Sequence, residues 1–482
     1  MESAVAGLDI GTTSIKLVLY GQNGVFYSDR MNHSEPGADG REFDPNTLFN
    51  DIICLIRKAC ECHKDVIIKA IGISTFFPSF IALDLYGEPL TKIITWMDNR
   101  GDDLVSNFKK NEADVVELHE KTGCVVHESY TLWKILWLKE KQKQFFLKSS
   151  KFLTLPDYLT YKFTGKFVIS YASASTTSLF NINSLKWDKE ILAMAGIGES
   201  QLSECYSIFH SERILKTLKL KTGLNDDAIF VIGAGDGHLS NIGGGCVTDR
   251  TVCSTIGTSS ALRIIHGSSI PGRNLWTHSL FDETRISGIA TNAGSSTLSW
   301  VCRNVLHKPF ENAFEYFDKN DGDCPEYLIL LPFFDGERGP GYNQKMSASI
   351  FGLSSGCTDS DVYAAAVEGI LFNLFDCYQI LIEHTGKPDE MVATGGYISS
   401  EKMVQMQSDI FNIKIKVPAI RESSAVGAAI LCLIALGEKK SLSDIKTVYE
   451  KIYYPNSEKH KMYMKKYCRY KLFYEISSQH NQ

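Results

Sequence analysis

The sequence lacks the features that mark a nucleic-acid-binding, zinc-binding or membrane-spanning protein. Its 50 Lys and Arg residues are outnumbered by 56 Asp and Glu residues, so the net charge is −6. No global basic field therefore exists to attract a nucleic acid or an anionic membrane. No second Cys or His pair stands at zinc spacing beside Cys60-Glu-Cys62, so these thiols are expected to be incidental. No apolar run approaches the ~18 residues that a membrane helix needs.

What the chain does have is the composition of a globular protein. It is 482 residues long, 44% hydrophobic and 22% charged, and this length exceeds one ordinary core, so two or three domains are expected. The 13 cysteines are scattered, and the N-terminus runs straight into a predicted strand with no secretory leader. We therefore expect reduced thiols and a cytoplasmic location.

One short phrase occurs twice, about half the chain length apart. Residues 7–16 contain Ile10-Gly-Thr-Thr-Ser14, and residues 252–261 contain Ile256-Gly-Thr-Ser-Ser260. In both, an apolar strand meets the phrase and a second strand follows at once. Such a turn gathers backbone N–H groups and small hydroxyls, which together bind phosphate oxygens. The repetition predicts two related halves, each with a phosphate-binding hairpin.

The pattern along the chain predicts an α/β fold with mixed sheets flanked by helices. In each half, hairpin strands come first, and helices alternate with strands after them. A long helix with an apolar stripe is expected over 359–385, and an Ala/Gly-rich helix that packs close to its neighbours over 423–435. The basic, aromatic tail after Gly437 is better explained by a closing surface helix than by a nucleic-acid patch.

Two aspartates are candidates for phosphoryl-transfer chemistry. Asp9 precedes the first turn, where a carboxylate would repel a bare phosphate but could hold Mg²⁺ through water; the alternative is a turn-capping Asp. Asp236 follows an apolar strand inside Gly233-Ala-Gly-Asp-Gly237, where a carboxylate could accept the proton of a substrate hydroxyl. The alternative for Asp236 is an N-cap. Lys16 could neutralise phosphate charge, or it could be an ordinary surface residue.

Two further motifs suit a polyol and a nucleotide. Trp96-Met-Asp-Asn-Arg100 combines an aromatic face with charged groups that can bind paired hydroxyls, although locally a salt bridge beside a buried Trp is the simpler interpretation. Gly395-Gly396 after a predicted strand would allow an adenine or ribose to approach closely. A bare Gly pair is, however, more often a tight turn.

From about residue 4 to about residue 435, the chain resembles the FGGY carbohydrate kinases. Residues 129–141 are similar to the family's first signature, with a departure only at Lys141, and residues 348–368 fit the second signature throughout. The resemblance implies the two-lobed ATPase fold of actin, hexokinase and the heat-shock chaperones, a ribonuclease H-like fold. It also implies ATP and Mg²⁺ as cofactors and a sugar or sugar acid as substrate.

The resemblance also implies roles for individual residues. Asp236 stands at the position of the family's catalytic base. Asp9 and Asp236 together stand at the positions of its metal site. The remaining candidates fall into two groups. Those for the nucleotide are Thr12, Thr13, Lys16, Gly257, Thr258, Gly294, Gly395, Gly396 and Ser400, which stands where the family has Asn. Those for the sugar are Ser79, Trp96, Asp98, Arg100, Tyr130 and Asp236. The implied lobes are 1–246 and 247–440, followed by a helical tail over 441–482, with a homodimer as one option.

Within the family, the resemblance is strongest to gluconate kinases, which implies conversion of D-gluconate to 6-phosphogluconate. Residues 95–100, 121–127 and 171–181 support it, and Arg100 or Lys134 could receive the substrate carboxylate. One departure is Pro78, which replaces a substrate-contacting His and makes the pocket wall more apolar. The alternatives are a xylulose, other ketose or polyol kinase, and a nucleotide-binding sensor without turnover. A chaperone-type ATPase is disfavoured because no peptide-binding domain follows residue 440.

Overall fold

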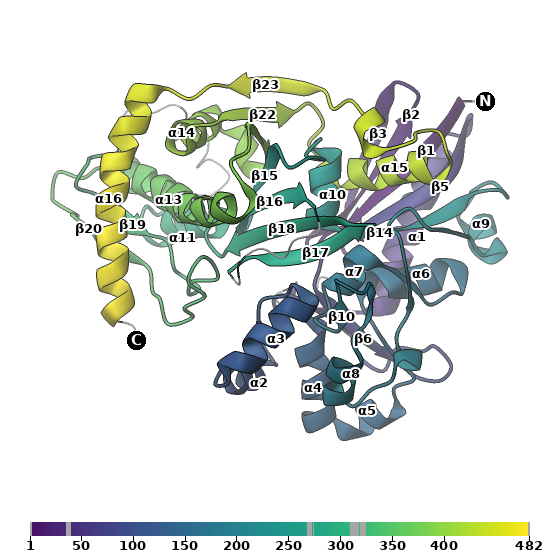
Figure 1. The fold of residues 1–482 in the computed structure, drawn as a ribbon. Coiled ribbons are helices and arrows are strands. Elements are labelled where there is room, and N and C mark those ends of the chain that lie inside the picture. The colour runs from purple at the N-terminus through teal and green to yellow at the C-terminus, as the bar shows by residue number, and fades with distance from the viewer. Residues whose placement is uncertain are drawn as a thin grey trace. The chain divides into compact units, whose positions relative to one another are not determined.

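The computed structural model describes residues 2–34, 40–267, 272, 274–308, 318 and 324–480 (Figure 1). Packing divides the chain into two compact units. The first comprises Met1–Val247, Gly267–Ile286 and Glu422–Lys446, and the second comprises Thr248–His266, Ser287–Arg421 and Thr447–Gln482. Packing thus assigns two later segments to the first unit. The predicted lobe boundaries at residues 246 and 440 remain predictions for the family's domains.

The first unit is built on a mixed sheet in the order β13-β14-β5-β1-β2-β3. The pair β1–β2 is antiparallel, whereas β1–β5 and β14–β5 are parallel. The central strands are buried on both faces, as the long apolar runs in β1 and β5 require. The strands are β1 Glu2–Ile10, β2 Ser14–Gly21, β3 Gly24–Asn32, β5 Val66–Thr75, β13 Ser211–Arg213 and β14 Ile229–Gly235.

Helix α15 (Ser423–Ala435) packs on β1, β5 and helix α10 (Asp236–Gly243) at unusually short range. A Cβ on Gly7 would lie 1.9 Å from the carbonyl oxygen of Ala425, and a Cβ on Gly243 would lie 1.9 Å from that of Ser423. Only glycine allows these backbones to meet. The predicted close packing of this Ala/Gly-rich helix is confirmed, and it seats α10 against the sheet.

A second layer of the first unit surrounds a four-stranded sheet in the order β4-β7-β6-β8, with a separate apolar core. Its strands are β4 Glu42–Phe43, β6 Ser79–Leu83, β7 Ile93–Thr95 and β8 Lys151–Leu153. The unit's other strands are short except for β17: β9 Val168–Ser170, β10 Phe180–Asn181, β11 Lys186–Trp187, β12 Glu204–Tyr206 and β17 Trp276–Phe281. Its remaining helices are α1 Pro45–Cys62, α2 Asp102–Phe108, α3 Glu112–Thr122, α4 Thr131–Lys141, α5 Lys143–Lys148, α6 Leu155–Thr164, α7 Tyr171–Ser175, α8 Lys189–Ala195 and α9 Lys216–Thr222.

The second unit repeats the scheme of an antiparallel hairpin followed by parallel strands. The strands β15 and β16 form the hairpin, and β21 runs parallel to β15 on its other side. The bounds are β15 Thr251–Ile256, β16 Ser260–His266, β18 Thr284–Thr291, β19 Ile329–Leu331, β20 Ser349–Phe351, β21 Glu390–Thr394, β22 Lys414–Pro418 and β23 Tyr449–Tyr453. The helices are α11 Ser295–Asn304, α13 Asp359–Thr385, α14 Glu401–Phe411 and α16 Ser457–His480.

Helix α13 is the one described helix that is long and apolar enough to cross a membrane by length and composition. However, 83% of its apolar window is buried inside the protein, so α13 is a core helix of the second unit. Its bounds, and those of α15, agree with the predicted helices over 359–385 and 423–435. The predicted α/β class with mixed sheets and flanking helices is confirmed.

Candidate active site

The first predicted phosphate turn lies at the tip of the β1–β2 hairpin. Gly11 N donates to the carbonyl oxygen of Ser14 at 3.1 Å, and the paired strands close on either side at Ile10 and Ile15. Thr12 is half-buried and Thr13 is exposed, so both hydroxyl-bearing residues lie at the accessible end of the sheet. Sequence had predicted this hairpin and its turn.

Asp9 and Lys16 face each other across the same hairpin. Lys16 Nζ lies 3.6 Å from Asp9 Oδ2, and Ser74 Oγ donates to Asp9 Oδ1 at 2.9 Å. Asp9 is only 6% exposed. Burial raises the pKa of its carboxyl, although Lys16 and Ser74 favour the ionised form and oppose the shift. A cation near Asp9 would act in the same direction as Lys16.

Asp236 is the first residue of α10, directly after β14. Its Oδ1 accepts a hydrogen bond from Gly237 N at 2.6 Å, and its backbone oxygen accepts one from Ser424 Oγ at 3.2 Å. The side chain is half-buried, so the carboxylate is oriented by the helix start without being enclosed. Gly235 before it admits the ring of Phe77, which would lie 2.1 Å from an added Cβ.

The predicted polyol motif forms a tight ionic cluster. Arg100 Nε donates to Asp98 Oδ1 at 2.6 Å, and Arg100 NH2 donates to Glu42 Oε1 at 2.5 Å. Burial disfavours ionised Asp98, but the hydrogen bonds from Arg100 outweigh it and lower the pKa of Asp98 below its usual value. The Arg100 guanidinium also lies 4.7 Å from the ring centre of Trp137. The predicted salt bridge is present, beside a half-buried Trp96.

The other sugar-side candidates lie where β6 meets α4. Ser79 is buried, and its hydroxyl accepts from Leu155 N at 2.8 Å, while Thr131 Oγ1 donates to the Ser79 carbonyl at 2.9 Å. Tyr130 caps the start of α4 and is 5% exposed. Lys134 is fully buried and donates to the carbonyls of Ser129 and Glu128 at 2.6 and 3.1 Å. Burial lowers the pKa of Lys134 to about 7.

Sequence reasoning missed an aromatic and histidine cluster beside Pro78. The Phe77 ring stacks on His238 at 4.7 Å, and His238 Nε2 lies 3.1 Å from His278 Nδ1. Trp276 stacks on His278 at 4.5 Å. Burial, followed by the proximity of His238, lowers the pKa of His278 well below its usual value. These residues come from three distant segments, so no local pattern could have indicated the cluster.

In the second unit, the β15–β16 hairpin carries the second predicted turn. Gly257 N donates to the carbonyl oxygen of Ser259 at 2.9 Å, and the strands close at Ile256 and Ser260. This turn is one residue shorter than the first. Thr258 at its tip is exposed.

Gly294 and Gly395 both press against this second turn. An added Cβ on Gly294 would lie 2.6 Å from the Thr258 carbonyl oxygen, and one on Gly395 would lie 2.5 Å from that of Ile256. Gly395 also has φ +96, a conformation that favours glycine. The structure therefore brings four of the nucleotide-side candidates together: Gly257, Thr258, Gly294 and Gly395.

Gly396 and Ser400 differ from these four. Nothing lies within 4 Å of a Cβ placed on Gly396, so this position borders open space. Ser400 is fully buried at the start of α14, where its hydroxyl accepts from Met403 N at 3.2 Å and donates to Asp318 Oδ1 at 2.6 Å. Its hydroxyl is therefore engaged in capping the helix.

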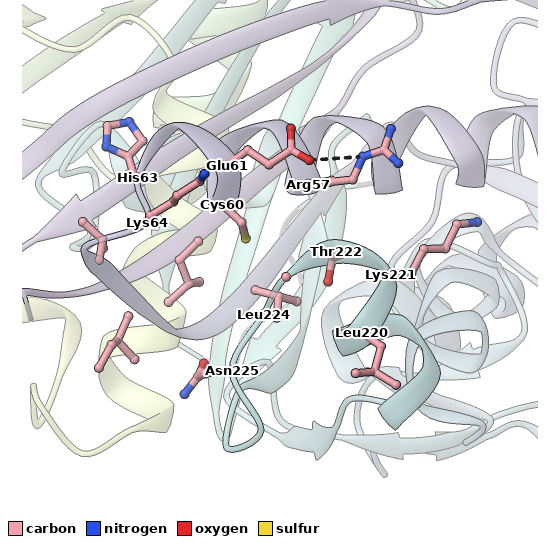
Figure 2. Close-up of a pocket in the computed structure, with 14 residues that line it drawn as sticks. Arg57, Cys60, Glu61, His63, Lys64, Leu220, Lys221, Thr222, Leu224 and Asn225 are labelled. Carbon is pink, nitrogen blue, oxygen red and sulfur yellow. Dashed lines mark ion pairs between the residues drawn. The ribbon is translucent and has the colours of Figure 1, made fainter.

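A separate hollow of ≈ 500 Å³ lies between the ends of α1 and α9 (Figure 2). Arg57 and Glu61 form an ion pair along its wall at 4.0 Å, and Cys60, Lys221 and Asn225 also line it. None of the predicted site residues lines this hollow. Both helices end here, and helix C-termini disfavour anions such as phosphate, so we assign no substrate to this hollow.

Across the described residues, no group of three or more His, Cys, Asp or Glu side chains could hold a metal ion by itself. The arrangement instead offers, in the first unit, a carboxylate beside a glycine turn and a second carboxylate at a helix start. In the second unit it offers a glycine-lined turn with exposed hydroxyls. A duplicated phosphate-type turn together with an acid after a strand is compatible with phosphoryl transfer.

Comparison with known families gives the class a name. Residues 4–243 match the N-terminal domain of the FGGY family of carbohydrate kinases, and residues 254–436 match its C-terminal domain. The chain therefore belongs to the FGGY family of carbohydrate kinases. The predicted membership, the sugar-kinase activity and the two-domain actin/hexokinase-like fold are confirmed.

Individual relatives act on different substrates. The chain is 32% identical to the gluconokinase of Bacillus subtilis over 92% of this chain and 90% of the relative. It is 26% identical to a xylulose kinase of Staphylococcus epidermidis over 99% of this chain and 98% of the relative. Among solved structures, a gluconate kinase from Lactobacillus acidophilus has a TM-score of 0.92 at 28% identity, covering 99% of this chain and 98% of that one. The family is thus established, whereas the sugar is not.

Proposed function

We propose that this protein transfers the γ-phosphoryl group of ATP to D-gluconate, giving 6-phospho-D-gluconate and ADP. The observation that carries the choice of sugar is the 32% identity to a gluconokinase over 92% of the chain. We further propose a cytoplasmic location, which agrees with thirteen free cysteines. The partners are then ATP and a sugar acid.

Asp236 is the proposed base. The hydrogen bond from Gly237 N fixes the orientation of its carboxylate, and its half-buried position leaves it accessible to a hydroxyl. In the reaction, a sugar hydroxyl loses its proton to Asp236 while its oxygen bonds to the phosphorus and the bond to ADP breaks.

The duplicated turns are the proposed phosphate contacts. Thr12, Thr13 and Lys16 would serve this role in the first unit, and Gly257 and Thr258 in the second. The turns fit phosphate because their exposed hydroxyls and backbone N–H groups are donors. Gly294, Gly395, Gly396 and Ser400 would border the nucleoside, with Ser400 acting through the start of α14.

Asp9 and Asp236 are the proposed residues that face Mg²⁺. When bound, Mg²⁺ supplies positive charge that neutralises the phosphates and keeps part of its water shell. Asp9 fits this role because its carboxylate is buried beside a turn and is only partly compensated by Lys16 at 3.6 Å. A site of this kind uses one or two carboxylates together with phosphate oxygens, so the absence of a ready-made cluster among the described residues does not argue against it.

For the sugar, the proposed contacts are Ser79, Trp96, Asp98, Arg100 and Tyr130. One observation favours a second candidate, a ketose such as xylulose. Arg100 already pairs with Asp98 and Glu42, and Lys134 is fully buried against two carbonyls. Neither cation is thus held ready for a carboxylate, whereas a neutral ketose would need none.

A coupled ADP-release assay with gluconate, xylulose, glycerol and related polyols tests the proposal. We expect gluconate to give the highest kcat/KM, and a higher value for xylulose would favour the second candidate. Asp236→Asn should lower kcat by roughly 10²–10⁴-fold, because the base is lost. Near wild-type turnover in this variant would refute the proposed base. ATP binding without sugar-dependent ADP release would indicate a sensor.

A further inference from the structure

The C-terminal helix α16 is not the simple surface helix that its basic composition predicts. Lys466 Nζ lies 2.5 Å from Glu368 Oε2, with side chains only 5% and 3% exposed, and Lys471 Nζ lies 3.0 Å from Asp376 Oδ1. Both carboxylates belong to the core helix α13. Figure 1 shows α16 beside α13 and α14. The charges of Lys466 and Lys471 are thus paired within the second unit.

Further along α16, Tyr474 contacts a different part of the second unit. Its hydroxyl donates to Glu337 Oε1 at 2.8 Å, and Gly341 N donates to the same oxygen at 3.1 Å. Glu337 is 1% exposed and lies in the loop over residues 332–343. Burial raises the pKa of Glu337, while the bonds from Tyr474 and Gly341 oppose that shift. A buried carboxylate that loses a donor must move or take up a proton.

The same loop supports the turn that carries Gly294. Two residues before Glu337, the Asp335 carbonyl accepts from Asn292 Nδ2 at 2.9 Å. Asn292 is in turn held by Ser296, whose hydroxyl lies 3.3 Å from the Asn292 carbonyl and 2.8 Å from that of Thr258. Displacement of the Glu337 loop would therefore change the positions of the Asn292–Gly294 turn and of Thr258.

We infer that Tyr474 is a positioning residue for the nucleotide: through Glu337 and Asp335 it fixes the Asn292–Gly294 turn against Thr258. The inference rests on the proposed nucleotide role of Gly294 and Thr258. The loop has further anchors, because Asn373 of α13 donates to the Gly339 carbonyl at 3.2 Å and the Phe334 ring lies 4.4 Å from that of Trp300 in α11. Loss of the Tyr474 hydroxyl should therefore weaken nucleotide binding without abolishing it, by roughly threefold to tenfold.

The helix itself provides a matched control. Tyr467, two turns earlier, also donates its hydroxyl to a buried carboxylate, but that carboxylate is Asp376 within α13. Tyr474→Phe and Tyr467→Phe thus remove the same group from the same helix. Each keeps its ring, so the contact of Phe333 with ring 474 at 5.8 Å is retained. Tyr474→Phe removes a hydrogen bond from the loop that contacts Asn292, whereas Tyr467→Phe removes none from that loop.

The test measures MgADP affinity by calorimetry, KM for ATP and for gluconate, and the thermal unfolding temperature of the full-length protein and both variants. We expect both variants to unfold at a lower temperature. Only Tyr474→Phe should raise the MgADP Kd and the KM for ATP, with the KM for gluconate unchanged. That split between the two substrates is a change that lost stability alone would not produce.

Equal nucleotide affinity in Tyr474→Phe and wild type would overturn the inference, as would an equal loss in both variants. A Glu337→Gln variant adds a second check, because it keeps the side-chain size and removes the charge that Tyr474 satisfies. It should also raise the Kd for MgADP. If the wild-type protein itself binds no MgADP, the proposed function fails together with the inference, whereas normal wild-type binding with unaffected variants removes the inference alone.

Discussion

The two hairpins share a fold and a phrase but differ in charge. In the first, the residue two places before the turn glycine is Asp9, which pairs with Lys16 across the strands. In the second, the same place is taken by Thr255, whose hydroxyl lies 2.7 Å from that of Thr394 and accepts from Arg263 at 2.9 Å. Both hairpin turns therefore have backbone and hydroxyl donors, but only the first hairpin also has a carboxylate beside its turn.

This difference indicates a division of work between the units. A carboxylate beside a phosphate-type turn is useful only where a cation is also bound, so metal chemistry should depend on the first hairpin. The second hairpin presents hydroxyls and backbone donors and is tightened by Gly294 and Gly395. It should therefore affect the affinity for nucleotide and have little influence on the need for metal.

The largest effect is expected at the charged position. Asp9→Asn should lower activity roughly 10- to 100-fold and raise the Mg²⁺ concentration needed for half-maximal rate, because the carboxylate proposed to hold the ion's water shell is lost. Thr255→Val, at the matching place, should leave the Mg²⁺ requirement unchanged. Titration of the rate with Mg²⁺ measures both, and an equal shift in the two variants would contradict the division.

A smaller effect is expected where the second turn is tightest. Gly294→Ala brings a methyl group to 2.6 Å from the Thr258 carbonyl oxygen, so the turn must shift, at a cost of about 1–3 kcal/mol in the free energy of unfolding. Nucleotide affinity should fall roughly 2- to 13-fold if half of that strain falls on binding. Gly356→Ala, also in the second unit and not a candidate site residue, is the control, since its Cβ would meet only Ser354 Oγ at 3.9 Å. Urea unfolding and MgADP binding measure both quantities, and equal behaviour of the two variants would count against this account.

Removal of one hydroxyl from each turn compares the hairpins directly. Thr12→Val and Thr258→Val should each raise the KM for ATP by about two- to tenfold, the value of one hydrogen bond, and leave the KM for the sugar unchanged. Steady-state kinetics at fixed sugar concentration measure the change. If Thr12→Val responds and Thr258→Val does not, the second turn has kept the sequence motif but does not contact the nucleotide.

The last prediction concerns the free energy of unfolding and not activity, at a buried charge in the first unit away from the hairpin. Because burial lowers the pKa of Lys134 to about 7, the unfolded chain binds a proton above that pH that the folded protein does not. Lys134 should therefore make the free energy of unfolding increase as the pH rises from 7 toward 10. Lys134→Met should flatten that rise in urea unfolding at pH 7, 8 and 9. Lys139→Met, exposed on the same helix, should keep the wild-type slope.

Local sequence patterns predicted the elements that depend on local forces. The bounds of α13 and α15 follow from apolar periodicity and small residues, and the hairpin turns follow from glycine beside small hydroxyls. The strand β17 was not predicted: its one sheet neighbour among the described residues is β18, which follows directly in the chain, and it packs on the distant helix α7. Likewise, Glu42 as a partner of Arg100 and Asp318 as a partner of Ser400 are contacts between residues far apart in the chain.

The site shows the same limit. Sequence named Asp9, Asp236 and both turns, because each residue type suggests its chemistry within a few positions. It could not indicate that Phe77, His238, His278 and Trp276 would gather, since their rings come from segments separated by up to about two hundred residues. Burial decides the state of such groups, and burial is a property of the folded chain.

The assignment of Glu422–Lys446 to the first unit has a consequence for biosynthesis. A chain emerging from the ribosome makes β1 and β5 early, but the helix that covers Gly7 and Gly72 is translated just over four hundred residues after the first strand. At about 5–20 residues per second, that interval lasts roughly 20–80 seconds. The unit that contains Asp9 and Asp236 therefore lacks the helix that covers Gly7 and Gly72 until almost the whole chain has been translated.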